Sequence, residues 1–185
     1  MAVTELALLR LRSDSSSTTN EALTQVQAAQ AAYSGYPVTF LQQIEDPSLL
    51  YLLGGWESVA KHNEWIASET NQKFLEQLKD DVEVEWMFHY NVNIFRRAEQ
   101  KDGVRSSSCP KCTRVRETHE TFSCGRGWKV DKRVDEDEEF ILFSGWNTVE
   151  DHFGFAKTES FKEFGKIREL LTGSEVKHMK VEKMK

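Results

Sequence analysis

Two stretches decide the fold, YLLGGWESVAKH at residues 51–62 and ILFSGWNTVEDH at residues 141–152. With an offset of 90 positions they share a Gly-Trp pair, then Ser or Thr two residues later, a valine and a histidine. In each stretch an apolar run ends at the tryptophan, and Ser and Thr are preferred helix N-caps. Each stretch is therefore predicted to end a strand and begin a helix. The chain is predicted to contain two copies of one unit.

Working outward from the first stretch gives a complete α+β unit. Period-two apolar alternation predicts its strands, and helical spacing or Ala- and Gln-rich composition predicts its helices. The elements are a strand Thr4–Arg12, a helix Glu21–Tyr33, strands Val38–Ile44 and Leu49–Trp56, a helix from the Ser58 cap to about Asp80, and a strand Val82–Phe95. The order βαββαβ is that of a ferredoxin-like unit.

The second stretch lies in a shorter copy. Its predicted elements are strands Val130–Val134 and Glu139–Trp146, a helix from Thr148 to about Leu171 that breaks near Thr158, and a last strand Ser174–Val181. Residues 98–127 are basic, rich in Ser and Cys and without a helical pattern, which predicts a long loop or linker. The chain is thus divided into a first half at 1–97, a linker at 98–127 and a truncated second half at 128–185.

The two units are expected to pack together. Such a unit covers one face of its antiparallel sheet with helices and leaves the other face apolar. Two units that meet face to face bury both surfaces. The predicted architecture is therefore a tandem, pseudo-dimeric α/β barrel within one chain, with further association into a homodimer as an alternative.

Composition excludes several classes of protein. The net charge of −6 and pI near 5.5 argue against a nucleic-acid partner. No apolar run approaches the roughly 18 residues that cross a bilayer, so no membrane association is expected. The first residues do not resemble a secretory signal, and three cysteines do not suit a disulfide framework. A soluble cytoplasmic protein is the expectation.

The pattern of strand, Trp, Ser or Thr, and His resembles the antibiotic biosynthesis monooxygenase group of the dimeric α/β barrel superfamily. The matching positions are Trp56, Ser58, His62 and Phe74 in the first copy, and Trp146, Thr148, His152 and Phe164 in the second. The resemblance implies a cavity between sheet and helices in each half. Members of the group carry out oxygenation of aromatic polyketides without a cofactor, haem degradation, or isomerase or cyclase chemistry, and others have no demonstrated catalysis.

The resemblance implies a function for this chain as well. It implies an enzyme of secondary metabolism, a monooxygenase, cyclase or isomerase. Such an enzyme would act without an organic cofactor on a small apolar, aromatic or polyketide-like molecule. The alternative is a non-catalytic ligand-binding or interaction protein with the same barrel.

His62 and His152 are the candidate catalytic residues. Each shares a helix face with apolar neighbours, and that face should look toward the sheet. An imidazole aimed into an apolar cavity could act as a general base, because its pKa lies near neutrality. The alternative is a structural histidine whose ring N–H bonds a backbone carbonyl, and its occurrence in both copies favours this alternative.

Five aromatic residues are candidates for substrate binding: Trp56, Trp86, Phe88, Tyr90 and Trp146. Trp86, Phe88 and Tyr90 alternate along one strand, so they line one face, and His89 lies on the other. Such a wall would suit a flat apolar ligand. It would suit an ordinary barrel core equally well.

The cysteines gather in the linker with one histidine. Cys109, Cys112, His119 and Cys124 have a spacing that could close a tetrahedral zinc site. Four protein ligands leave no open position, so such a zinc would be structural. The alternative is a surface loop with incidental thiols. Redox chemistry at the Cys-x-x-Cys pair is not expected, because the βαβ context of a redox motif is missing.

Overall fold

The computed structural model describes residues 1–12, 17–92, 94 and 124–183. The chain divides into two compact units. The first unit is Met1–Gln100 with Gly127–Ile141 and His178–Lys185, and the second is Lys101–Arg126 with Leu142–Lys177. The boundaries of the units differ from those of the two sequence repeats. Residues 127–141 and the last strand lie in the second repeat but belong to the first unit. The division at residues 97 and 128 stays a prediction.

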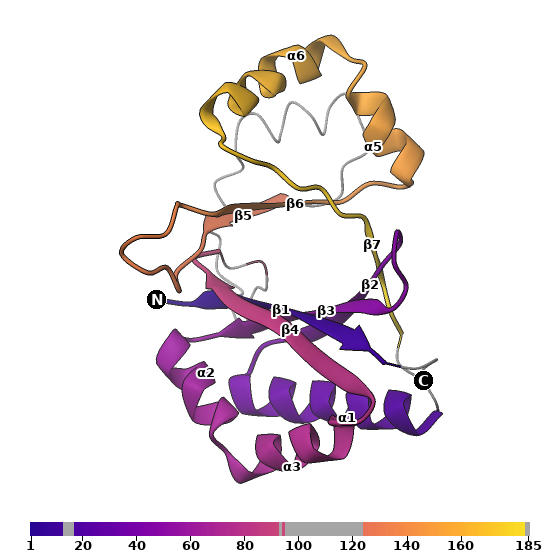
Figure 1. Cartoon of the computed structure of the whole chain (residues 1–185), viewed down its shortest axis with the longest axis vertical. Coiled ribbons are helices and arrows are strands. Elements are labelled where there is room, and N and C mark those ends of the chain that lie inside the picture. The colour runs from indigo at the N-terminus through magenta and orange to yellow at the C-terminus, as the bar shows by residue number, and fades with distance from the viewer. Residues whose placement is uncertain (13–16, 93, 95–123, 184–185) are drawn as a thin grey trace, which may run out of the picture. The chain divides into compact units, whose positions relative to one another are not determined.

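The first unit is built on one antiparallel sheet of five strands (Figure 1). The strands are β1 (Val3–Leu11), β2 (Val38–Gln43), β3 (Leu49–Trp56), β4 (Val82–Tyr90) and β7 (Met179–Val181). They lie in the order β4-β1-β3-β2-β7. The first four keep the arrangement of a split βαβ fold. The predicted α+β, ferredoxin-like class is confirmed.

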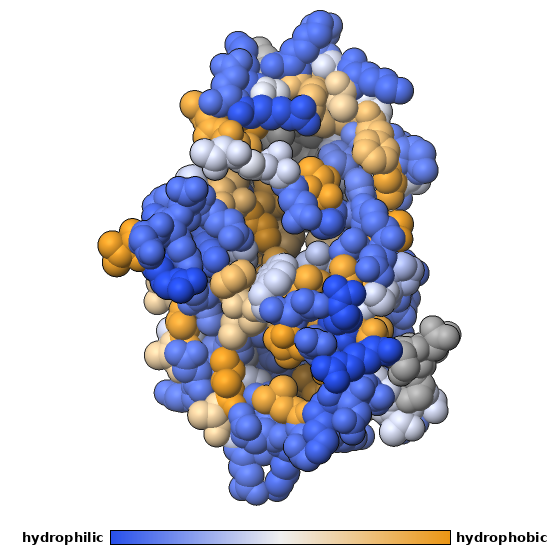
Figure 2. Space-filling model, in the orientation of Figure 1, coloured by the Kyte–Doolittle hydropathy of each residue, from blue (hydrophilic) through white to orange (hydrophobic). Residues whose placement is uncertain are grey.

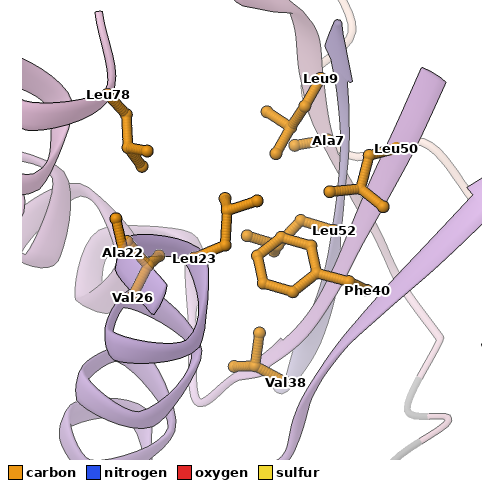
Figure 3. Packing of buried hydrophobic residues seen from close by; sticks show 10 residues of the cluster. All are labelled: Ala7, Leu9, Ala22, Leu23, Val26, Val38, Phe40, Leu50, Leu52 and Leu78. Carbon is orange, nitrogen blue, oxygen red and sulfur yellow. The ribbon is translucent and has the colours of Figure 1, made fainter. Parts of the chain in front are cut away.

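Three helices cover one face of this sheet: α1 (Ser17–Ser34), α2 (Val59–Ile66) and α3 (Glu69–Leu78) (Figure 1). In Figure 3, Leu23 of α1 points toward Phe40 and Leu52 of the strands. The buried cluster comprises Ala7, Leu9, Ala22, Leu23, Val26, Val38, Phe40, Leu50, Leu52 and Leu78. Each large apolar side chain buried there contributes about 1.5–3 kcal/mol. Because Ala7 and Leu9 belong to this cluster, the odd-numbered residues of β1 face the helices.

The helix predicted from the Ser58 cap to Asp80 is two helices. It stops after Ile66 and starts again at Glu69. Ser68 has an extended backbone (ψ 147°), and its hydroxyl accepts a hydrogen bond from the Asn71 amide at 3.2 Å. A serine in this geometry is a preferred N-cap, so it begins a new helix instead of continuing the old one.

In the second repeat, β5 (Cys124–Trp128) and β6 (Phe140–Ser144) form a two-stranded sheet. The helical region consists of α5 (Val149–Phe155), α6 (Glu159–Gly165) and a 3-10 helix (Lys166–Leu170), so the predicted break near Thr158 is confirmed. The strand predicted at Val130–Val134 is wrong. The strand β5 precedes it and takes the last four residues of the predicted linker, whereas the Val134 side chain is fully exposed.

The last strand is shorter than predicted and has an unexpected partner. It covers Met179–Val181 instead of Ser174–Val181, and it pairs with β2 of the first unit. The Glu182 amide extends this pairing by donating to the Phe40 carbonyl at 2.9 Å. Covering the outer edge of β2 removes one exposed strand edge from the first unit's sheet.

On the face shown in Figure 2, hydrophilic side chains dominate and hydrophobic ones form separate patches. Scattered apolar residues of this kind are normal on folded proteins. Within the residues that the structure describes, no helix has the length and apolar character needed to span a membrane.

Candidate functional site

A buried carboxylate lies on the helix-facing side of β1. Glu5 is two residues from Ala7, on the same face of the strand, and is 5% exposed. Directly across the ladder is Gly54 of β3. A Cβ at that position would lie 3.1 Å from Glu5 Oε2 and 2.8 Å from Gln30 Nε2. Glycine at position 54 therefore leaves the space in which the carboxylate sits.

Two neutral donors hold this carboxylate. The Trp56 indole Nε1 and the Gln30 amide Nε2 each donate to Glu5 Oε2 at 2.7 Å. Burial raises the pKa of Glu5 from 4.5 to about 7, although these two hydrogen bonds favour the ionised form. Glu5 therefore exchanges a proton near neutral pH, in a region from which water is largely excluded.

His62 lies beside this carboxylate. The Ser58 hydroxyl caps α2 by accepting from the Lys61 amide at 3.1 Å, and the helix then turns His62 toward the sheet, as predicted. The imidazole stacks on the Trp56 indole with centroids 4.3 Å apart and an interplanar angle of 17°. Its Nε2 lies 3.5 Å from Glu5 Oε2. Burial lowers the pKa of His62 to about 3, with a further contribution from His89, so the ring is neutral at physiological pH.

The second nitrogen of His62 meets another histidine. Its Nδ1 lies 2.7 Å from His89 Nε2, and His89 Nδ1 lies 2.7 Å from Asp131 Oδ2. Asp131 is held there because the chain after β5 runs along the edge of β4, where the Val130 amide donates to the His89 carbonyl at 2.7 Å. Glu5, His62, His89 and Asp131 thus form an unbroken row of titratable groups. We call these four residues the acid–base row.

The hydrogen-bond partner of His62 is not the one that either interpretation of the sequence predicted. The ring bonds a second imidazole and approaches a carboxylate, so it neither points into a purely apolar space nor bonds a backbone carbonyl. Every buried side-chain nitrogen and oxygen in the described residues has a hydrogen-bond partner. The site is therefore closed and internally satisfied in this conformation.

Among the predicted site residues of the first unit, Trp56 and His62 are brought together by the structure. Trp86, Phe88 and Tyr90 lie on the opposite face of the sheet, because Phe88 pairs with Leu6 whereas His89 pairs with Glu5. The rings of Trp86 and Phe88 stack at 5.5 Å, and the Tyr90 hydroxyl donates to Glu139. These three rings therefore lie on the face of the sheet opposite Glu5 and His89, and their binding of substrate stays a prediction.

Trp146 and His152 form a separate pair in the second unit. Their rings lie 5.0 Å apart at 33°, and both are partly exposed. The Trp146 indole donates to the Ser144 hydroxyl at 2.9 Å. The structure places this pair against Phe155, whose ring is 5.5 Å from Trp146.

The predicted zinc ligands cannot be assessed as a set. Cys109, Cys112 and His119 lie outside the described residues, and Cys124 begins β5. Among the residues described, no three His, Cys, Asp or Glu side chains are grouped so as to hold a metal ion. The zinc site stays a prediction.

Sequence reasoning missed three members of the acid–base row. A signal for Glu5 was present, since a glutamate shares the period-two face of β1 with Val3, Ala7 and Leu9. His89 was placed correctly on the face opposite Phe88 but was given no role. Nothing local indicated Asp131, because its approach to His89 depends on where the chain runs after residue 128.

Comparison with known proteins supports the fold. Neither a protein-family model nor a curated protein matches the sequence. A solved candidate monooxygenase from Fusobacterium nucleatum is 12% identical, with 100% of this chain and 93% of that one aligned at a TM-score of 0.64. The full coverage of this chain agrees with a tandem duplication.

Two further solved structures align with about half of the chain. A candidate antibiotic biosynthesis monooxygenase from Bordetella bronchiseptica is 19% identical over 48% of this chain and 93% of its own, with a TM-score of 0.43. SnoaB, a cofactor-independent oxygenase from Streptomyces nogalater, is 16% identical over 47% of this chain and 90% of its own, with a TM-score of 0.40. At such identities a likeness establishes fold alone. The chain therefore has the fold of the Fusobacterium protein, as its resemblance to the antibiotic biosynthesis monooxygenase group predicts.

Proposed function

We propose that this chain is an enzyme of the monooxygenase, cyclase or isomerase kind that needs no organic cofactor and acts on an aromatic or polyketide-like substrate. The observation that carries the proposal is Glu5, a buried carboxylate beside a neutral imidazole in the first unit. The fold shared with a candidate monooxygenase supports the same conclusion. Because fold does not fix function, the argument rests on the chemistry of the site.

The chemistry suits removal of a proton from carbon or oxygen. A general base is most effective when its pKa lies near the working pH, and the pKa of Glu5 is about 7. Oxygenation, cyclisation and isomerisation of a phenol or 1,3-diketone each begin with such a deprotonation. The resulting enolate can reduce dioxygen, attack a carbonyl or take the proton back at another carbon. One base can therefore serve all three reactions.

His62 and Trp56 have supporting roles in this proposal. The neutral His62 ring presents Nε2 to the carboxyl of Glu5 and can share its proton. Trp56 fixes both groups, since its face stacks on His62 and its N–H bonds Glu5. The Trp56 indole would also offer an aromatic surface to a flat ligand.

A non-catalytic ligand-binding or interaction protein is the second candidate. The observation that favours it is closure, because His62 is 3% exposed and both of its ring nitrogens have partners. A site of this kind must open before a substrate reaches Glu5. A purely structural acid–base row would never need to open.

Turnover separates the two candidates. Purified protein would be incubated in air with a panel of polycyclic phenols and 1,3-diketones, with oxygen uptake and product masses recorded. We expect turnover of at least one compound, and a loss of about 10²- to 10⁴-fold in Glu5→Gln, because the variant lacks the base.

The matched control is His178→Gln. His178 lies in the same unit, away from the acid–base row, and its ring bonds Glu45 at 2.6 Å. This variant should keep the wild-type rate. Binding of panel compounds without turnover, measured by equilibrium dialysis, would support the non-catalytic candidate instead.

A further inference from the structure

We propose that the acid–base row is a proton relay that connects the buried carboxyl of Glu5 with solvent at Asp131. The inference deepens the proposed function, because a base that is closed off from water needs a route by which its proton leaves and returns. The relay assigns His89 and Asp131 as residues that act through His62 and Glu5, not on the substrate.

Distance and burial both support a relay. Three successive contacts of 3.5, 2.7 and 2.7 Å join Glu5, His62, His89 and Asp131. The side-chain exposures are 6%, 3%, 3% and 30% in the same order. The row is therefore buried at one end and reaches water at the other.

The order of donors along the row follows from chemistry. An ionised Asp131 only accepts, so His89 Nδ1 carries a proton toward it. His89 Nε2 is then the acceptor for the proton on His62 Nδ1. This leaves the lone pair of His62 Nε2 facing Glu5, a contact that is favourable when Glu5 is protonated and repulsive when it is not. Every proton in the row thus lies on the side that faces Asp131.

Transfer moves one proton in three linked steps. The Glu5 proton passes to His62 Nε2, the His62 Nδ1 proton passes to His89 Nε2, and the His89 Nδ1 proton passes to Asp131 Oδ2. Glu5 ends ionised and Asp131 ends protonated, while both imidazoles stay neutral and exchange tautomers. Protonation of Glu5 runs the same steps in reverse. The 3.5 Å contact must shorten for transfer, so the approach of His62 to Glu5 is the expected slow step.

Among the described residues, the groups that contact the row do not offer a competing route. Gln30 from α1 and Trp56 from β3 donate hydrogen bonds to Glu5, and neither side chain gains or loses a proton near neutral pH. Next to His89, the Tyr90 hydroxyl is bonded to Glu139. Burial, with added repulsion from Glu139 and Asp131, raises the pKa of Tyr90, so its proton stays in place.

The relay can be tested without any substrate. The carbonyl band of protonated Glu5 would be identified in infrared spectra by its loss in Glu5→Gln, and its relaxation would be followed after a rapid pH jump. Asp131→Asn is nearly isosteric and can still accept from the His89 amide, but it cannot carry the proton. We expect relaxation at least about tenfold slower in Asp131→Asn, since a positioned acid or base typically contributes 10²- to 10⁴-fold.

Two further variants control this experiment. Asp131→Glu restores a carboxyl and should return the rate toward that of the wild type. Asp135→Asn removes an exposed carboxylate of the nearby acidic turn and should leave the rate unchanged. Relaxation of folded Asp131→Asn at the wild-type rate would show that the relay does not exist.

A measurement on the wild type alone keeps the proposal falsifiable if Asp131→Asn fails to fold. The relaxation rate would be measured in mixtures of H₂O and D₂O. Several protons moving together give a curved dependence on the deuterium fraction, whereas a single transfer gives a straight line. A straight line would overturn the relay. Failure of the substrate panel with an intact relay would instead contradict the proposed function only.

Discussion

Two tryptophan–histidine pairs occupy corresponding positions in the repeats, but their surroundings differ. Trp56 and His62 are almost fully buried, with rings 4.3 Å apart at 17°. Trp146 and His152 are partly exposed, with rings 5.0 Å apart at 33°. The Trp56 indole donates to the buried carboxylate of Glu5, whereas the Trp146 indole donates to the hydroxyl of Ser144, two residues earlier in the sequence. One sequence motif therefore supports two different chemical environments.

A single position accounts for much of this difference. Gly54 in the first repeat corresponds to Ser144 in the second. The missing side chain at position 54 makes room for Glu5 and Gln30, whereas the Ser144 hydroxyl itself satisfies the Trp146 indole. The motif fixes the helix cap and the stacking of the rings. The residue that faces the indole decides whether an ionisable group lies beside the histidine.

The largest expected difference is in the cost of removing the indoles. Trp56→Ala should lower the free energy of unfolding by about 4 kcal/mol. The change leaves a cavity at a fully buried position and removes one of the two hydrogen-bond donors to the buried carboxylate of Glu5. Trp146→Ala should cost less than about 2 kcal/mol, because less apolar surface is lost. Urea unfolding followed by circular dichroism measures both. Equal losses would show that the two environments do not differ as described.

The second expected difference concerns pH. The pKa of Glu5 in the folded state, about 7, lies above its value of 4.5 in the unfolded chain, so its contribution to stability is full below pH 4.5 and is lost as pH rises through 7. Gln cannot ionise. Glu5→Gln should therefore gain stability relative to the wild type by about 3 kcal/mol between pH 4.5 and pH 8.

Glu64→Gln is the matched control for the pH series. Glu64 is an exposed carboxylate, and its pKa is lowered because the Lys61 ammonium bonds it at 2.7 Å. Lysine keeps its charge from pH 5 to pH 8 and Glu64 stays ionised, so the stability difference from the wild type should be constant over that range. The destabilisation that comes from the lowered pKa of His62 is present in each protein and largely cancels. A constant difference for Glu5→Gln as well would contradict the raised pKa.

The smallest expected difference comes from exchanging the residues at the corresponding position. Gly54→Ser should cost about 1–3 kcal/mol, because the new side chain displaces Gln30 and Glu5 in a packed region. Ser144→Gly should cost only about 0.5–1 kcal/mol, the usual penalty for glycine near a strand end. Chemical unfolding of the two variants provides the test. A larger cost for Ser144→Gly would reverse the interpretation of this position.

Local sequence patterns were sufficient to predict many of the strands and helices. Apolar alternation predicted β1 to within a residue at each end, and the Ser58 and Thr148 caps mark the starts of α2 and α5. The break near Thr158 was also predicted. The extra break at Ser68 was missed, because a serine within an otherwise helical segment is recognised as a cap only once its backbone is seen to be extended.

Contacts between distant segments could not be predicted in the same way. The pairing of β7 with β2 depends on where the C-terminal segment returns, and residues 43 and 179 are far apart in sequence. The same holds for Asp131 and His89, which meet because the chain after β5 follows the edge of β4. Such contacts are selected by the whole fold, since neither partner's local pattern specifies the other.

By itself the sequence determined the α+β class, the repeated strand–helix junction and the direction in which His62 faces, because these follow from side-chain periodicity and from capping chemistry. The tertiary structure alone decided which groups surround that histidine. Glu5 and Asp131 are 126 residues apart in sequence, and only the pairing of β1 with β4 and the course of the chain after β5 along the edge of β4 bring them to opposite ends of one acid–base row.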